Sequence, residues 1–141
     1  RQALQTLVTA STRIITALAL GGFVLIAGFG SVLLALLYGD GFSEGYSVLL
    51  ILALGQLANA LFGPVALLLN MTGNEKLTLI GVSLSVVINA GLNVLLIPRF
   101  GIEGAATATA ATLIIWNLML AVLLKRRVGY HSTILGPRLP L

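Results

Sequence analysis

Four long stretches without a charged residue constrain this chain more than any other feature. Its eight basic and four acidic side chains are clustered, which leaves uncharged runs at 14–39, 45–74, 77–98 and 104–124. At about 1.5 Å rise per residue, a helix of about 20 residues covers the roughly 30 Å hydrocarbon core of a bilayer. The sequence therefore predicts an all-α membrane protein with four antiparallel transmembrane helices, at about 14–39, 46–71, 77–98 and 104–124.

Composition limits the classes of function that this chain can have. The chain is 58% hydrophobic and 9% charged, against about 25% charged residues in soluble domains, and it has no cysteine. No Asp, Glu, His, Lys or Arg lies inside an uncharged run, and no phosphate-binding glycine loop or histidine-carboxylate cluster is present. We therefore expect no enzyme activity, no cofactor and no metal site. The basic residues lie at span ends rather than in one patch, so we expect membrane lipids and no nucleic acid as partners.

The basic residues also predict orientation. Seven of the eight flank the predicted spans on one side and only Arg99 lies on the other, so both termini are expected in the cytoplasm. We interpret residues 1–13 as a cytoplasmic, interfacial segment with a helix start at Ser11 or Thr12, 14–127 as the transmembrane domain, and 128–141 as a cytoplasmic tail. The chain begins at Arg1 without a methionine, and we interpret it as part of a longer protein.

Glycine and proline predict where the helices end and bend. Gly39 and Gly73 are expected helix stops, so the second and third spans should be antiparallel neighbours. The pair Gly63 and Pro64 predicts a kink near Ala60, because proline removes a backbone donor and clashes with the carbonyl four residues earlier.

Small residues predict close packing. Gly104, Ala108 and Thr112 form a ridge at spacing four, which we expect to press against the third span. The glycines of the first span, Gly21, Gly22, Gly28 and Gly30, are of the kind that membrane helices use for close backbone approach.

Amides and hydroxyls are the only polar groups expected at depth. Gly81, Ser85, Asn89 and Asn93 recur every fourth residue and so share one face of the third span. Hydrogen bonding between helices is one reading of such side chains, and the lining of a polar cavity is the other. The candidate cavity-lining residues, which also include two side chains of the second span, are Gln56, Asn59, Asn89 and Asn93.

A family resemblance adds to this reading. The residues that carry it are the strings Gly-Asn-Glu-Lys at 73–76, Val-Ile-Asn-Ala-Gly-Leu-Asn at 87–93 and Leu-Ile-Pro-Arg-Phe-Gly-Ile-Glu-Gly-Ala-Ala at 96–106. Over about residues 10–127, the chain resembles the C-terminal part of polysaccharide flippases. These exporters of O-antigen and lipid-linked oligosaccharides belong to the superfamily that also holds multidrug and toxin extrusion (MATE) proteins.

The resemblance implies a partial C-terminal bundle of a MATE-like transporter in the cytoplasmic (inner) membrane, with the four spans matching the last four of twelve. It further implies translocation of a lipid-linked oligosaccharide or polysaccharide precursor by alternating access. The remaining helices of the full-length transporter would be its protein partners. Two alternatives stay open, an ion-coupled multidrug exporter of the same superfamily and a non-transporting membrane scaffold. The family's charged cavity residues have no counterparts at depth here.

Overall fold

The computed structural model describes the backbone of residues 2–128 and, within that range, the side chains of 6–39, 41–42 and 45–127. Every regular element in the described range is helical. In chain order the elements are α1 (Gln2–Tyr38), the 3₁₀ helix η1 (Asp40–Gly45), α2 (Tyr46–Phe62), α3 (Val65–Met71) and α4 (Glu75–Val128). Apart from the last backbone position of α4, the predicted tail at 128–141 lies outside the described residues.

Two of these helices are long and apolar enough to cross a membrane, namely α1 over Thr6–Tyr38 and α4 over Glu75–Arg127. The pair α2 and α3, bent by 40°, makes a third span if it is counted as one. Gly101, with φ 55° and ψ −132°, interrupts α4, which is therefore two helices. We call them the N-terminal arm (75–100) and the C-terminal arm (102–128). Over the described residues the prediction of an all-α chain is confirmed, and two or three of its helices are long and apolar enough to span a membrane.

The first helix ends where the sequence predicts and begins earlier. Gly39 follows the last residue of α1 with φ 92°, and its N–H donates to the carbonyl of Ala35 at 2.9 Å. The expected helix start at Ser11 or Thr12 is wrong, because α1 runs unbroken from Gln2. Thr12 is buried and its hydroxyl donates to the carbonyl of Val8 at 2.8 Å, a bond to the preceding turn that a helix tolerates.

A break at Gly63 and Pro64 separates α2 from α3. Since Pro64 has no N–H, the carbonyl of Ala60 loses its helical donor. Two other donors reach that carbonyl, the N–H of Gly63 and the hydroxyl of Thr16 on α1, both at 3.1 Å. Gly63 has φ 68° and ψ −162°, a conformation that side chains disfavour. The predicted kink is confirmed, with the break at the Gly63–Pro64 pair itself rather than near Ala60.

The turn from α3 into α4 is a glycine C-cap of the Schellman type. Gly73 has φ 74° and its N–H donates to the carbonyl of Asn70, while the N–H of Asn74 donates to that of Leu69 at 2.9 Å. The predicted helix stop at Gly73 is confirmed. Gly101 reverses the chain again, inside the turn predicted between the last two spans.

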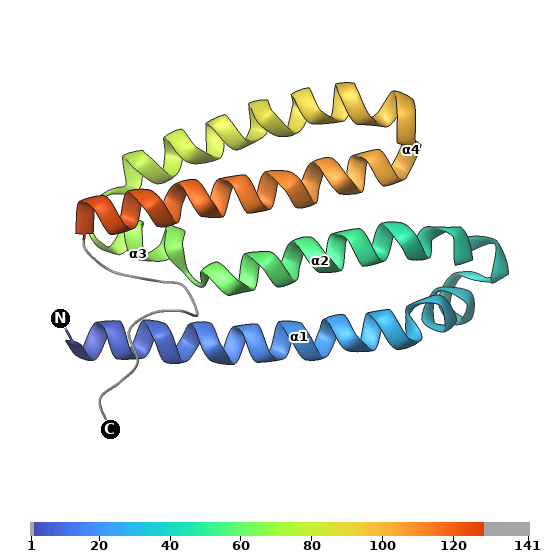
Figure 1. Ribbon diagram of the computed structural model, residues 1–141, viewed down its shortest axis with the longest axis horizontal. Coiled ribbons are helices and arrows are strands. Elements are labelled where there is room, and N and C mark those ends of the chain that lie inside the picture. The colour runs from blue at the N-terminus through green and yellow to red at the C-terminus, as the bar shows by residue number, and fades with distance from the viewer. Residues whose placement is uncertain (1, 129–141) are drawn as a thin grey trace.

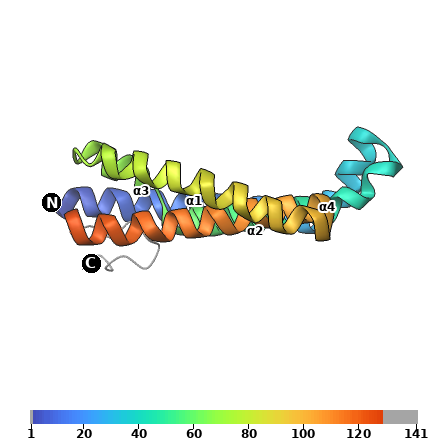
Figure 2. The same ribbon diagram turned by 90° about the horizontal axis from the view of Figure 1, so that it is seen from above.

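The helices lie side by side in a nearly flat layer (Figures 1 and 2). In Figure 1 their order across the layer is α1, α2, the C-terminal arm and the N-terminal arm. The expectation that the second and third spans are neighbours is wrong, because the C-terminal arm lies between α2 and the N-terminal arm and runs parallel to α2. The first turn of α1 and the last turn of α4 lie at the same end of the layer.

The main buried cluster of apolar side chains lies at this same end, where α1 begins, α3 packs and α4 finishes (Figure 1). Its members are Val8, Val65, Leu68, Leu69, Leu120 and Leu124. Long apolar side chains elsewhere, such as Leu36 of α1 and Val94 of the N-terminal arm, are 79% and 73% exposed. Such surfaces suit hydrocarbon rather than water, which fits the membrane-spanning character of these helices.

Candidate functional site

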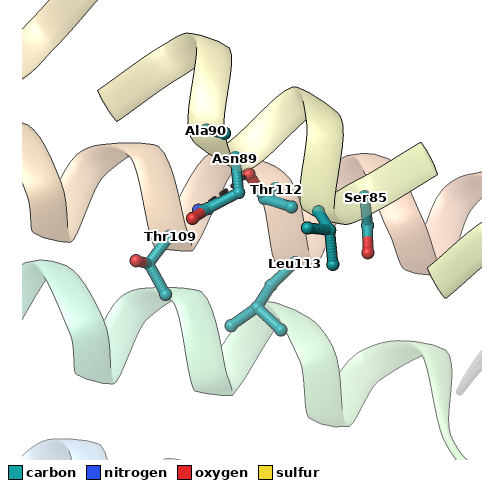
Figure 3. Close-up of a pocket in the computed structure, with 7 residues that line it drawn as sticks. Ser85, Asn89, Ala90, Thr109, Thr112 and Leu113 are labelled. Carbon is teal, nitrogen blue, oxygen red and sulfur yellow. Dashed lines mark hydrogen bonds between the residues drawn. The ribbon is translucent and has the colours of Figure 1, made fainter. Parts of the chain in front are cut away.

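A hollow of about 380 Å³ lies between the two arms of α4 (Figure 3). Three of its lining side chains carry hydroxyl groups, one carries an amide and three are apolar. They are Ser85, Val86, Asn89 and Ala90 of the N-terminal arm with Thr109, Thr112 and Leu113 of the C-terminal arm. We call this surface the inter-arm hollow. Its size falls within the range of about 300–1,000 Å³ that is typical of small-molecule sites.

Asn89 is at the centre of a hydrogen-bonded group in this hollow. Its Nδ2 donates to the hydroxyl of Thr112 at 3.3 Å, and Thr112 in turn donates to the carbonyl of Ala108 at 2.7 Å. The Nδ2 of Asn93 donates to both the backbone carbonyl and the Oδ1 of Asn89, each at 2.9 Å. Asn93 does not itself line the hollow. It holds the Asn89 amide in an orientation that presents its NH₂ group to the C-terminal arm.

The other two candidates belong to a second group, between α2 and the C-terminal arm. Asn117, which is 4% exposed, donates to the Oδ1 of Asn59 at 2.7 Å and to the carbonyl of Leu113 at 2.8 Å. Asn59 then donates to the Oε1 of Gln56 at 3.3 Å. Gln56 is exposed and borders an otherwise apolar groove of about 280 Å³ between α1 and α2. We call this second surface the α1–α2 groove.

The four candidate cavity-lining residues are therefore not brought together in one cavity. Asn89 lines the inter-arm hollow with Asn93 behind it, whereas Gln56 and Asn59 belong to the group centred on Asn117. Among the hydroxyl-bearing lining residues, sequence reasoning placed Thr112 only in the packing ridge and missed Thr109 as a lining residue. Its spacing of three from Thr112 is the signal that could have found it, because residues three apart share a helix face.

Gly104 and Ala108, two of the predicted packing residues, lie where the two arms of α4 are in close contact. A Cβ added at Gly104 would lie 2.5 Å from the carbonyl oxygen of Leu96, so the ridge of the C-terminal arm does press against the N-terminal arm, as predicted. Ala108 is fully buried in the same ridge. Gly63 and Pro64 form the break between α2 and α3 described above, and neither lines the inter-arm hollow.

The inter-arm hollow is electrically neutral. No Asp, Glu, Lys, Arg or His lines it. Within the part of the chain that the structure describes, no three His, Cys, Asp or Glu side chains are grouped closely enough to hold a metal ion. Near the opposite end of the layer from the apolar cluster, the hydroxyl of Ser47 at the start of α2 donates to the carboxylate of Glu103. Because the inter-arm hollow has hydroxyl, amide and apolar side chains but no charge, it can bind a ligand by hydrogen bonds and apolar contact.

Comparison with known proteins gives no match: no family model matches the chain, and no curated protein or solved structure matches it. Over the described residues, the fold and the site define a helical protein with two or three helices long and apolar enough to span a membrane, and with a neutral hollow between the two arms of α4.

Proposed function

We propose that this chain is part of a membrane transporter that moves a lipid-linked oligosaccharide or polysaccharide precursor across the cytoplasmic membrane by alternating access. The observation that carries the proposal is the inter-arm hollow, in which Asn89 and three hydroxyl side chains lie within otherwise apolar helices. Beyond their bonds within the protein, these side chains keep lone pairs and one amide hydrogen that a polar cargo or water can bond.

The layered arrangement supports a further part of the proposal. α1 and the N-terminal arm occupy the two edges of the layer, and each has a helical neighbour on one side only (Figure 1). We propose that these edges pack against the remaining helices of a full-length, MATE-like transporter, so that the hollow becomes the wall of a larger cavity. In this arrangement the two long helices and the bent α2–α3 pair supply four spans, with the arms of α4 counted separately.

The distribution of basic residues supports an orientation. Lys76 at the start of α4 and the run Lys125–Arg127 at its end lie at the same end of the layer (Figure 1). The junction of the two arms at Gly101, two residues after Arg99, lies at the other end. We propose that the first end, which also contains the apolar cluster, faces the cytoplasm. Both termini would then be cytoplasmic.

A non-transporting scaffold is the second candidate. The observation that favours it is that the bonds of Asn59 to Asn117 and of Asn89 to Thr112 join neighbouring helices, as structural hydrogen bonds in membranes do. A scaffold has no need for a hollow open to a ligand, so the two candidates differ in whether the hollow binds anything.

Complementation tests the proposal directly. A strain without its lipid-linked oligosaccharide flippase, given the complete gene that encodes this chain, should recover its surface polysaccharide. The double variant Asn89→Leu with Asn93→Leu should lose that recovery, while Asn70→Leu, an exposed amide in α3, should keep it. Failure of the unaltered gene, or full recovery with the double variant, would contradict the proposal. Drug resistance without surface polysaccharide would favour a multidrug exporter instead.

A further inference from the structure

The hydrogen bonds already formed in the inter-arm hollow determine which bonds remain for a ligand. The hydroxyl of Ser85 donates to the carbonyl of Val82 at 2.7 Å, and that of Thr109 donates to the carbonyl of Ala105 at 3.0 Å. The hydroxyl of Thr112 likewise donates to its own helix. All three hydroxyl hydrogens are therefore used within the helices that carry them.

The groups that remain free to bond a ligand are mainly hydrogen-bond acceptors. A hydroxyl oxygen has two acceptor lone pairs beside its one hydrogen. Ser85 and Thr109 therefore each keep two lone pairs for a ligand, whereas Thr112 keeps one because Asn89 already donates to it. On the donor side, Asn89 uses one hydrogen of its NH₂ group for Thr112 and has one left. A ligand in this hollow meets more acceptors than donors.

This balance selects the chemistry of the ligand. A phosphate or carboxylate brings acceptors only, and no Lys or Arg lines the hollow to compensate its charge. An ammonium group brings donors, but its charge would be transferred from water to a surface without a carboxylate. A neutral hydroxyl group can donate to Ser85 or Thr109 and accept from Asn89. The apolar lining side chains Val86, Ala90 and Leu113 can contact the C–H face of a ring.

We propose that the inter-arm hollow binds an uncharged, polyhydroxylated ring by accepting hydrogen bonds from its hydroxyl groups, and that it excludes the charged part of any larger substrate. This inference deepens the proposed function and rests on it, since it names the part of a lipid-linked oligosaccharide that this hollow recognises. The phosphate-bearing part must then lie elsewhere. Figure 3 shows Ser85 and Thr109 at opposite ends of the lining group, with Asn89 and Thr112 between them.

The sole tryptophan provides a binding signal. Trp116 lies one turn from Thr112 on the C-terminal arm, and its ring is 3.2 Å from where a Cβ on Gly81 would be, one turn from Ser85. The protein, reconstituted in lipid nanodiscs, can be titrated with octyl β-D-glucoside below its micelle-forming concentration while Trp116 fluorescence is recorded. A saturable change is expected. The octyl glucoside whose four free hydroxyls are O-methylated should bind at least about tenfold more weakly, because it has acceptors only and loses several bonds of about 0.5–1.5 kcal/mol each.

Single substitutions test which side chains of the hollow form hydrogen bonds with the glucoside. Ser85→Ala and Thr109→Val should each weaken glucoside binding by roughly 2- to 12-fold, the factor that corresponds to about 0.5–1.5 kcal/mol for one hydrogen bond. Thr107→Val is the matched control, because Thr107 donates to the carbonyl of Glu103 in the same way and is exposed outside the hollow. It should leave binding unchanged.

Three results would overturn the inference: equal binding of the methylated glucoside, equal binding of octyl phosphate, or equal effects of Thr107→Val and Thr109→Val. Because binding is measured without transport, its failure is distinct from failure of the proposed function. Recovery of surface polysaccharide without glucoside binding would refute the inference alone. Glucoside binding that depends on Ser85 and Thr109, without any recovery, would support the inference and refute the transport function.

Discussion

The two interfaces of α2 differ although the residues on both are of the same apolar and small types. Towards the C-terminal arm, a Cβ added at Gly55 would lie 2.8 Å from the Cβ of Ala110, and the bond of Asn117 to Asn59 crosses the same contact. Towards α1, a Cβ added at Gly22 meets nothing within 4 Å, and the α1–α2 groove lies open beside it.

The difference shows what glycine does in this chain. Gly55 permits close contact between two helices, and Gly81 and Gly104 do the same between the arms of α4. By contrast, Gly21 and Gly28 resemble Gly22 in having no neighbour where a Cβ would lie. The expectation of close backbone approach along α1 is wrong within the described chain at these three positions, although the Tyr46 ring does lie 3.0 Å from a Cβ added at Gly30. The tight interface therefore joins α2 to the C-terminal arm, and α1 is the looser neighbour.

Replacement of the two glycines should give the largest contrast. Gly55→Val should destabilise the fold by about 3 kcal/mol, because the added atoms overlap the backbone and side chain of Ala110 and must force the helices apart. Gly22→Val, which adds the same atoms over open space, should change stability by less than about 0.5 kcal/mol. The measurement is unfolding of the purified protein by SDS in mixed micelles. Equal losses for the two variants would remove the distinction between the interfaces.

Loss of the hydrogen bond between the Asn117 and Asn59 side chains, at the tight interface, should give the next largest effect on stability. Asn117→Leu removes the donor to Asn59 and leaves a part-buried amide oxygen with fewer partners, so a loss of about 1–2 kcal/mol is expected in the same unfolding assay. Asn70→Leu deletes an exposed amide and serves as the control, with a change close to zero. A neutral result for Asn117→Leu would mean that packing alone holds this interface.

Removal of the Thr16 hydroxyl at the looser interface should have the smallest effect. Thr16→Val removes the donor from α1 to the carbonyl of Ala60 and should cost about 1 kcal/mol. In a Pro64→Ala background the backbone N–H of residue 64 can bond that carbonyl, so the same change should cost less than about 0.5 kcal/mol. Additive losses in this double-mutant cycle would show that Thr16 does not compensate for the proline.

The sequence predicted the helical segments and the glycines at their ends well, because those signals are local. Uncharged runs mark the spans, and Gly39, Gly73 and Gly101 lie at the ends of helices with positive φ. The order of helices across the layer depends on which faces fit together. Small residues are present on many faces, and nothing local distinguishes Gly55, which has a close partner, from Gly22, which has none.

The candidate site was predictable in part for the same reason. The spacing of Asn89 and Asn93 indicates a shared face, and these two side chains do bond each other. The division of the four amides into two groups depends on the C-terminal arm. Its Thr112 accepts a hydrogen bond from Asn89, and its Asn117 donates one to Asn59. Pairings between distant segments of a chain follow from tertiary packing, which the periodicity of a single helix does not contain.

The central claim is that the inter-arm hollow is a water-accessible polar surface within a membrane-spanning protein, and labelling of single cysteines tests it most directly. The chain has no native cysteine, so Ala90→Cys, which lines the hollow, and Val87→Cys, which does not and is 68% exposed, can be compared at nearly the same depth. With a membrane-impermeant maleimide on sealed vesicles, position 90 should be labelled from at least one side and position 87 should stay unlabelled from both. Labelling of position 87 with protection of position 90 would place the polar face against lipid and contradict the account.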